Sequence, residues 1–100
     1  MSANPARGEA AFVVDGKAIV LRPTFEALIA AEAELGPLFA LVERASAGDL
    51  KFAEMTALFW HCSDQNATRD RIANAVVEGG LVKATPVLRM LLSQILQGRD

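Results

Sequence analysis

Two neighbouring residues carry most of the reactive chemistry that this sequence could offer: His61 is its one histidine and Cys62 its one cysteine. A zinc site needs four ligands, or three ligands and a water, and a Cys–His nucleophile needs its two side chains within hydrogen-bond reach. Consecutive residues on a helix point in different directions, so this pair meets neither requirement. We therefore expect no metal, no cofactor and no nucleophile here. A single cysteine also excludes an internal disulfide and is typical of a reducing compartment.

The glutamates on segments that we expect to be helical include Glu26, Glu32, Glu34, Glu43 and Glu54. Two carboxylates that share a cleft could act as general acid and general base. Acidic residues scattered over amphipathic helices are more typical of the solvated face, which is the interpretation we favour. The sequence also has no phosphate-binding loop, dinucleotide-binding glycine pattern or serine-hydrolase elbow. These patterns predict that the protein is not an enzyme.

Two aromatic residues are candidates for binding a partner protein. Phe39 lies off the apolar stripe of its expected helix, and Trp60 lies about 100° around its helix from Phe59. A small domain can use both faces of its helices, in which case both rings would belong to the core. Alternatively, aromatic side chains that folding does not need are typical anchors of protein interfaces. We therefore predict Phe39 and Trp60 as partner-binding residues.

The composition is that of one folded domain. Of the 100 residues, 52% are hydrophobic and 22% charged, which is typical of a globular chain rather than a disordered one. Twelve acidic and ten basic residues give a net charge of −2, without the basic surplus typical of nucleic-acid-binding proteins. The longest apolar-rich stretch, residues 82–96, is interrupted by Lys83 and Arg89, so it is too polar to cross a membrane. We expect a cytoplasmic protein with a flexible tail over residues 1–8 and a single domain over residues 9–100.

The beginning of this domain has the pattern of a β-hairpin. Asp15-Gly16 separates two apolar runs, and this dipeptide favours a type I′ turn because both turn residues need a positive φ angle. A two-residue loop would pair Val14 with Lys17 and Phe12 with Ile19. An isolated hairpin is only marginally stable, so its apolar face needs a layer of helices or a strand from another subunit. The second arrangement would make the protein a homo-oligomer.

We expect the rest of the chain to form four or five short α-helices, which gives an α+β fold class in a mostly helical single domain. Caps, glycines and prolines place these helices at about residues 24–35, 37–47, 50–62 and 69–78, with a last helix from residue 81 or Pro86 to residue 97. Asp49 is the expected cap of the third helix, and Gly79-Gly80 the expected end of the fourth. The apolar stripes predict a core of Phe12, Ile19, Leu21, Phe25, Leu28, Leu41, Phe52, Met55, Phe59, Ile72, Val76, Leu88, Leu91 and Leu92.

Several short segments resemble a known family. They are Arg7-Gly8-Glu9, Val14-Asp15-Gly16-Lys17, Leu21-Arg22-Pro23-Thr24-Phe25, Ala27-Leu28, Glu34-Leu35-Gly36 and Ala47-Gly48-Asp49-Leu50. They are similar to the small tail assembly chaperones of siphophage-like particles, in the branch found in gene transfer agents of alphaproteobacteria. The segment Leu21-Arg22-Pro23-Thr24-Phe25, directly after the hairpin, is the most specific part. The second half of the chain matches in its helical pattern.

The resemblance implies a role in assembling a phage-like tail inside a bacterial host cell. Such chaperones are encoded between the major tail protein and the tape measure protein. They bind the tape measure protein and keep it soluble until tube subunits polymerise around it. They are not enzymes and need no cofactor, and the major tail protein is a second expected partner. Some members of the branch are described as tail tube proteins, so a structural, tube-associated component of the particle is the alternative.

Overall fold

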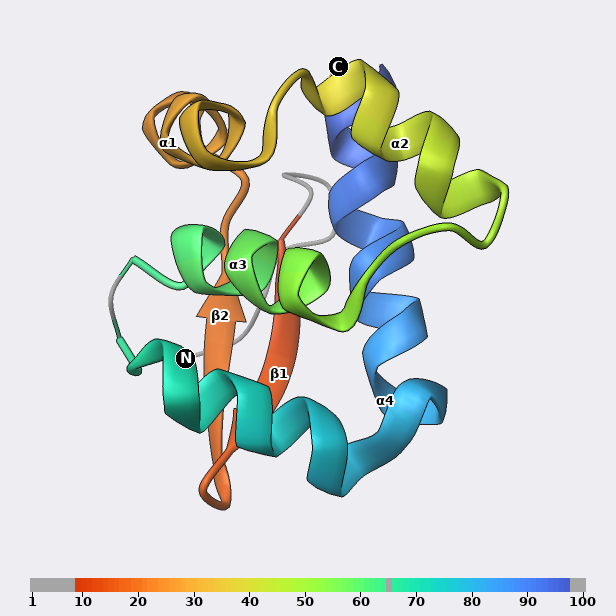
Figure 1. The fold of residues 1–100 in the computed structure, drawn as a ribbon. Coiled ribbons are helices and arrows are strands. Elements are labelled where there is room, and N and C mark those ends of the chain that lie inside the picture. Colours follow the sequence, from red (N-terminus) through yellow and green to blue (C-terminus); the bar gives the residue numbers. More distant parts are fainter. Residues whose placement is uncertain (1–8, 65, 98–100) are drawn as a thin grey trace.

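The chain begins with the expected hairpin. In the computed structural model, which describes residues 9–64 and 66–97, strand β1 (Ala10–Val14) pairs antiparallel with strand β2 (Lys17–Leu21) (Figure 1). Phe12 lies opposite Ile19, so the predicted register is confirmed. Every second residue of β1 is buried, which is the pattern of a strand with one face against a core.

Local sequence signals set the turn and the first helix. Asp15 and Gly16 have φ angles of 54° and 76°, as a type I′ turn requires. Thr24 is the N-cap residue of helix α1 (Phe25–Leu35), and its hydroxyl accepts a hydrogen bond from a first-turn backbone N–H at 3.1 Å. Gly36 ends this helix with a φ angle of 85°, a backbone conformation that favours glycine.

Helices α2 (Leu38–Ser46) and α3 (Phe52–Cys62) follow, joined by a short loop. The expectation that Asp49 caps α3 is wrong, because the helix starts two residues later than predicted. Lys51 takes the N-cap position, and the Glu54 carboxylate accepts its backbone N–H at 2.9 Å. As in a capping box, the Glu54 side chain folds back from the first turn and pairs with the backbone N–H of the N-cap residue, Lys51.

Helix α4 (Arg69–Gln97) is two helical arms joined by a break at Gly80, whose φ and ψ angles are 76° and 170°. The predicted stop at the glycine pair therefore occurs, and the second arm starts directly after it. Pro86 lies inside this second arm rather than at its start, so the earlier of the two predicted starts is confirmed. Proline has no N–H, so it cannot donate the helical hydrogen bond to the carbonyl four residues before it. Because Pro86 is exposed, that carbonyl lies close to solvent.

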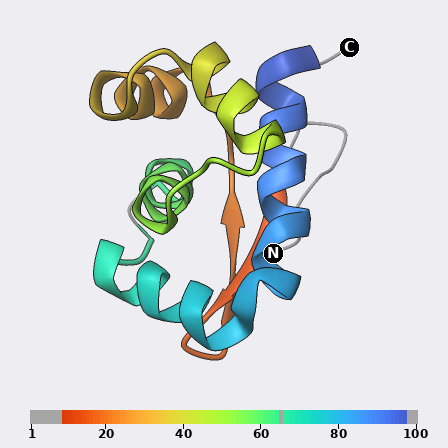
Figure 2. The same cartoon turned by 45° about the vertical axis from the view of Figure 1, so that its right-hand side comes forward.

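The helices surround the hairpin from several directions. Helix α3 lies across the hairpin, α1 and α2 lie beyond one side of α3, and the first arm of α4 lies beyond its other side (Figures 1 and 2). The second arm of α4 runs beside β1 (Figure 2). This arrangement supplies the layer of helices that the apolar face of the hairpin needs.

The core lies between the hairpin, α3 and the two arms of α4. The Phe12 and Phe59 rings meet edge to face at its centre, with their centroids 5.2 Å apart. The largest side chains buried with Phe59 come from β2 and from every helix except α1, and they are Leu21, Leu41, Leu58, Ile72, Val76 and Leu91. Four predicted core residues, Ile19, Leu28, Leu88 and Leu92, are partly buried and pack against this cluster.

Two predicted core residues are wrong. Phe25 is 79% exposed and Phe52 is 47% exposed. Each is the first residue of its helix, and side chains tilt toward the helix N-terminus, so both project past the end of the core. On α1 the apolar pattern was ambiguous as well, because that helix is apolar on nearly all sides.

Within the described ranges, 9–64 and 66–97, no helix is long and apolar enough to span a membrane. The expected flexible tail at residues 1–8 lies outside these ranges.

Candidate partner-binding surfaces

Trp60 and His61 belong to a polar cluster that ties three helices together. Glu34 on α1 receives hydrogen bonds from the Arg69 guanidinium at 2.6 Å and from His61 Nε2 at 2.8 Å. The guanidinium carbon of Arg69 lies 4.5 Å from the centre of the Trp60 ring, a cation–π contact. The hydrogen bond from Arg69, and then the one from His61, lower the pKa of Glu34 to about 2. The cluster therefore links α1, α3 and α4, and it holds Trp60 half-buried.

Phe39 has the opposite environment. It is 65% exposed on α2, so its ring is free to contact another protein. In the part of the chain that the structure describes, no ring contact joins Phe39 to Trp60. The two predicted partner-binding residues lie on different helices, Phe39 on α2 and Trp60 on α3.

His61 and Cys62 have separate structural roles. His61 is hydrogen-bonded to Glu34, whereas the Cys62 side chain is buried in the core. Burial raises the pKa of the Cys62 thiol to about 12, so the free thiol stays protonated near neutral pH and is a poor nucleophile. Among the described residues, no three His, Cys, Asp or Glu side chains are grouped as metal ligands would be.

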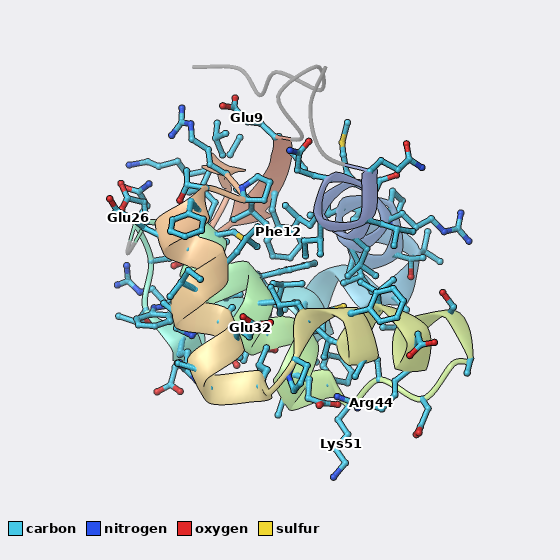
Figure 3. The ribbon with its side chains drawn as sticks, turned by 90° about the horizontal axis from the view of Figure 1, so that it is seen from above. Glu9, Phe12, Glu26, Glu32, Arg44 and Lys51 are labelled. Atoms are coloured by element: carbon cyan, nitrogen blue, oxygen red, sulfur yellow. The ribbon has the colours of Figure 1, made fainter. Side chains whose placement is uncertain are left out.

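A second ion pair fixes the loop between α2 and α3. Arg44, labelled in Figure 3, donates two hydrogen bonds to the Glu54 carboxylate, at 2.9 and 2.6 Å. These bonds, followed by the one from the Lys51 backbone, lower the pKa of Glu54 to about 2. Two of the five glutamates considered as catalytic acids, Glu34 and Glu54, are therefore in ion pairs that hold helices together.

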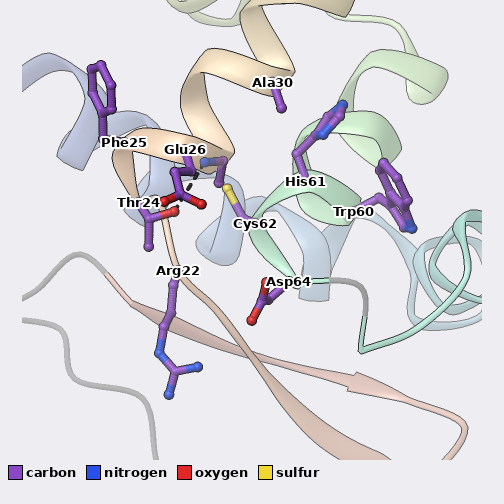
Figure 4. A pocket seen from close by; sticks show the side chains of 10 residues that line it. Arg22, Thr24, Phe25, Glu26, Ala30, Trp60, His61, Cys62 and Asp64 are labelled. Carbon is purple, nitrogen blue, oxygen red and sulfur yellow. Dashed lines mark hydrogen bonds between the residues drawn. The ribbon is translucent and has the colours of Figure 1, made fainter.

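A cavity of about 530 Å³ lies between the start of α1 and the end of α3 (Figure 4). Its lining includes Arg22, His61 and Asp64, with Phe25 at the rim, pointing away from the other side chains. The Arg22 backbone N–H donates to the Cys62 carbonyl at 2.7 Å, which fixes the end of the hairpin to the end of α3. The lining mixes charges of both signs.

The outer edge of β1 lines a second cavity, of about 750 Å³, together with Gly79 and Lys83 near the break in α4. Val14 and Lys17, next to the two-residue turn, form a hydrogen-bonded pair, and such pairs alternate along an antiparallel ladder. The N–H and C=O groups of Ala11 and Val13 therefore point away from β2. Within residues 9–64 and 66–97, no backbone hydrogen bond from another element reaches these groups. The edge could therefore accept an added strand.

Helix α1 has an exposed apolar face that was not among the predicted partner-binding sites. Eight of the eleven residues of this helix are apolar and the other three are glutamates, yet Ala31 is the one residue that is fully buried. Phe25 and Ile29 are 79% and 49% exposed. A helix that is apolar on nearly all sides is normally buried or covered by a partner, and that signal is visible in the sequence.

A protein family described as phage tail tube protein, GTA-gp10, matches residues 7–98. The chain belongs to this family. The matched residues include the whole hairpin and all four helices of the described structure. No curated protein matches the chain, and no solved structure does.

Membership in this tail family confirms the coarser part of the resemblance, a protein of phage or gene-transfer-agent tails. Exposed surfaces of this tail protein include the outer edge of β1, the ring of Phe39 and the outer face of α1.

Proposed function

We propose that this tail-family protein is an assembly chaperone that binds the tape measure protein during tail morphogenesis. The observation that carries the proposal is the amount of apolar surface left on the helices, including Phe25, Phe39 and Val82, which are 79%, 65% and 87% exposed. A domain of this size needs its apolar side chains for its own core. Side chains of this kind left in water favour a role in binding another protein.

The physical demands of a tape measure protein fit such a surface. It is a very long and largely helical chain, and its apolar stripes need a cover until the tube encloses it. A small helical domain can cover such a stripe by packing helix against helix. Many copies along one chain would add avidity without any single tight contact. In this role the protein is a binding protein without catalysis, cofactor, nucleic acid or membrane, and the major tail protein is a second candidate partner.

The alternative is a structural, tube-associated component of the tail, which the description of the family favours. The unpaired outer edge of β1 supports it, because a strand from a neighbouring subunit could extend the two-stranded sheet. The described residues contain only this one hairpin, whereas a tube built from strands needs more of them from each subunit. We therefore place the chaperone first.

Co-expression tests the proposal. The cognate tape measure protein should be largely insoluble when expressed alone, and soluble and co-purifying when expressed with this protein. A tape measure protein that stays insoluble in the presence of the folded partner would overturn the chaperone function.

Mass spectrometry of purified particles separates the two candidates. A chaperone leaves when the tube closes, so it should be absent from finished particles that contain the tape measure and major tail proteins. Its presence at a fixed ratio to the major tail protein would favour the structural alternative.

A further inference from the structure

The outer face of α1 carries a continuous apolar stripe made of Phe25, Ile29 and Ala33. These residues are four positions apart, so they follow one another along the helix surface. All three are exposed, Phe25 at 79% and Ile29 at 49%. Seen from above, α1 lies in front of the molecule and no other helix or strand covers it (Figure 3).

Folding does not account for this stripe. Ala31, fully buried, lies on the opposite side of α1, and Ala27, Leu28 and Leu35 pack against the core beside it. At about 100° per residue, Ile29 is about 160° away from Ala31 around the helix. The stripe therefore faces away from α2 and α3, and its side chains add nothing to the core.

Two carboxylates border the stripe. The three apolar residues span an arc of about 80°, and Glu32 and Glu26 lie about 20° beyond its two ends. Figure 3 shows them on opposite sides of α1. Of the ion pairs formed by the described residues, none involves Glu26 or Glu32, whereas Glu34 is paired with Arg69 and His61. The Glu32 carboxylate accepts a hydrogen bond from the neutral backbone N–H of Leu38, at 3.1 Å.

We propose that the α1 stripe docks an amphipathic α-helix of a partner protein that carries Lys or Arg along the borders of its own apolar stripe. A helix fits because side chains four residues apart form a ridge that packs between the ridges of another helix. Basic borders fit because they would neutralise Glu26 and Glu32, and opposite charges select the partner and its orientation. That this helix belongs to the tape measure protein rests on the proposed function.

The same charges disfavour two other occupants. A helix that lies on a membrane surface carries Lys and Arg on its polar face, and α1 has three glutamates and no basic residue. Two copies of α1 packed on one another would bring carboxylates near carboxylates, which is unfavourable. A partner helix with basic borders is the occupant that the charges of α1 fit.

Two synthetic helical peptides test this surface directly. Both peptides are about 18 residues long and have the same leucine stripe. The stripe is bordered by lysine in the first peptide and by glutamate in the second. In fluorescence anisotropy at low salt, the lysine peptide should bind at least about tenfold more tightly than the glutamate peptide. Equal affinities would overturn the proposal.

Variants of the protein locate the site. The double variant Phe25→Ser/Ile29→Ser should lose binding of the lysine peptide by about tenfold or more. The charge reversal Glu26→Lys/Glu32→Lys should invert the preference in favour of the glutamate peptide. Val77→Ser removes an apolar side chain that is 66% exposed on α4 and serves as the matched control, which should bind as the wild type does. Circular dichroism checks that each variant folds, and a folded Phe25→Ser/Ile29→Ser protein that binds normally would refute the site.

The tape measure protein is the second probe, and it separates this proposal from the proposed function. If the lysine peptide binds through α1 but the protein does not capture the tape measure protein, the docking surface is supported and the chaperone function is rejected. Capture of the tape measure protein that survives both α1 double variants would keep the chaperone and overturn the docking surface. Dimerisation or binding to lipid vesicles that is lost in Phe25→Ser/Ile29→Ser would also overturn it, because the stripe would then have another occupant.

Discussion

Gly16 shows how one residue controls the hairpin. Its φ angle of 76° follows the 54° of Asp15, and nothing lies within 4 Å of the place where a Cβ atom would be. The need for glycine at this position therefore comes from the backbone conformation and not from a lack of space. Residues with a side chain disfavour positive φ angles, and β-branched residues disfavour them most.

We expect Gly16→Val to lower the free energy of unfolding by about 1–2 kcal/mol, measured by chemical denaturation. Gly79→Ala is the matched control. Gly79 has no positive φ angle, and an added Cβ would lie 3.4 Å from a methylene of the flexible Lys83 side chain. That substitution should leave stability equal or slightly higher, because alanine favours helix more than glycine does. Equal stability of Gly16→Val and wild type would contradict the argument from the turn.

At the scale of elements, two ion pairs connect helices through residues that are not neighbours in the sequence. Arg44 on α2 holds Glu54 at the start of α3, and Arg69 at the start of α4 holds Glu34 on α1. The members of these pairs are 10 and 35 residues apart in the sequence. Both carboxylates have pKa values of about 2, below their ordinary value of 4.5.

The Glu54 pair predicts a pH dependence of stability. A lowered pKa in the folded state means that the carboxylate stabilises the fold fully above pH 4.5 and loses this contribution as the pH falls toward 2. Glu54→Gln should therefore be less stable than wild type at neutral pH, and its stability should fall less steeply over that acidic range. Denaturant titrations at several pH values measure both effects. Glu43→Gln, on the same helix as Arg44, should keep wild-type stability at neutral pH, and a Glu54→Gln curve parallel to that of wild type would argue against the pair.

The second arm of α4 is held by its buried side. Leu91 is fully buried, whereas Leu96, five residues later on the same arm, is 56% exposed. Leu91→Ala should cost about 2–5 kcal/mol through lost burial and the cavity that it leaves. Leu96→Ala should change stability by no more than about 0.5 kcal/mol. Thermal unfolding of the two variants compares them, and an unchanged melting temperature for Leu91→Ala would mean that this arm does not belong to the core.

At the scale of the whole molecule, the fold divides its aromatic residues between the core, the helix junctions and the surface. Phe12 and Phe59 meet in the core, Trp60 packs under Arg69 where three helices join, and Phe39 faces solvent. This division decides which aromatic residues can serve a partner without harm to the fold.

We expect Phe39→Ser and Trp60→Ser to behave differently. Phe39→Ser should keep the circular dichroism spectrum and the melting temperature of wild type while it weakens co-purification with the tape measure protein, because an exposed ring would be an anchor of the complex. Trp60→Ser should lower the melting temperature, since it removes the ring beneath Arg69 and contacts with the core. If Phe39→Ser co-purifies as well as wild type, the binding surface does not include α2.

The features of this protein that depend on neighbouring residues could be predicted from the sequence. Asp15-Gly16 gave the turn and register of the hairpin, Thr24 and Gly36 gave the ends of α1, and the segments around Leu21–Phe25 gave the tail family. Turn and capping energies act over a few residues, so they can be read directly from the order of the chain.

Packing between distant segments sets which apolar residues are buried and which charges meet. Phe25 and Phe52 look like core residues in the sequence, but each is the first residue of its helix and is exposed. Helix α1 is apolar on nearly all sides, so its periodicity cannot choose a buried face. The pairing of Glu34 with Arg69 likewise follows from how the helices pack, and so does the lack of an ion pair for Glu26 and Glu32 among residues 9–64 and 66–97. Burial and ion pairing depend on contacts between distant segments, and those exist only once the chain has folded.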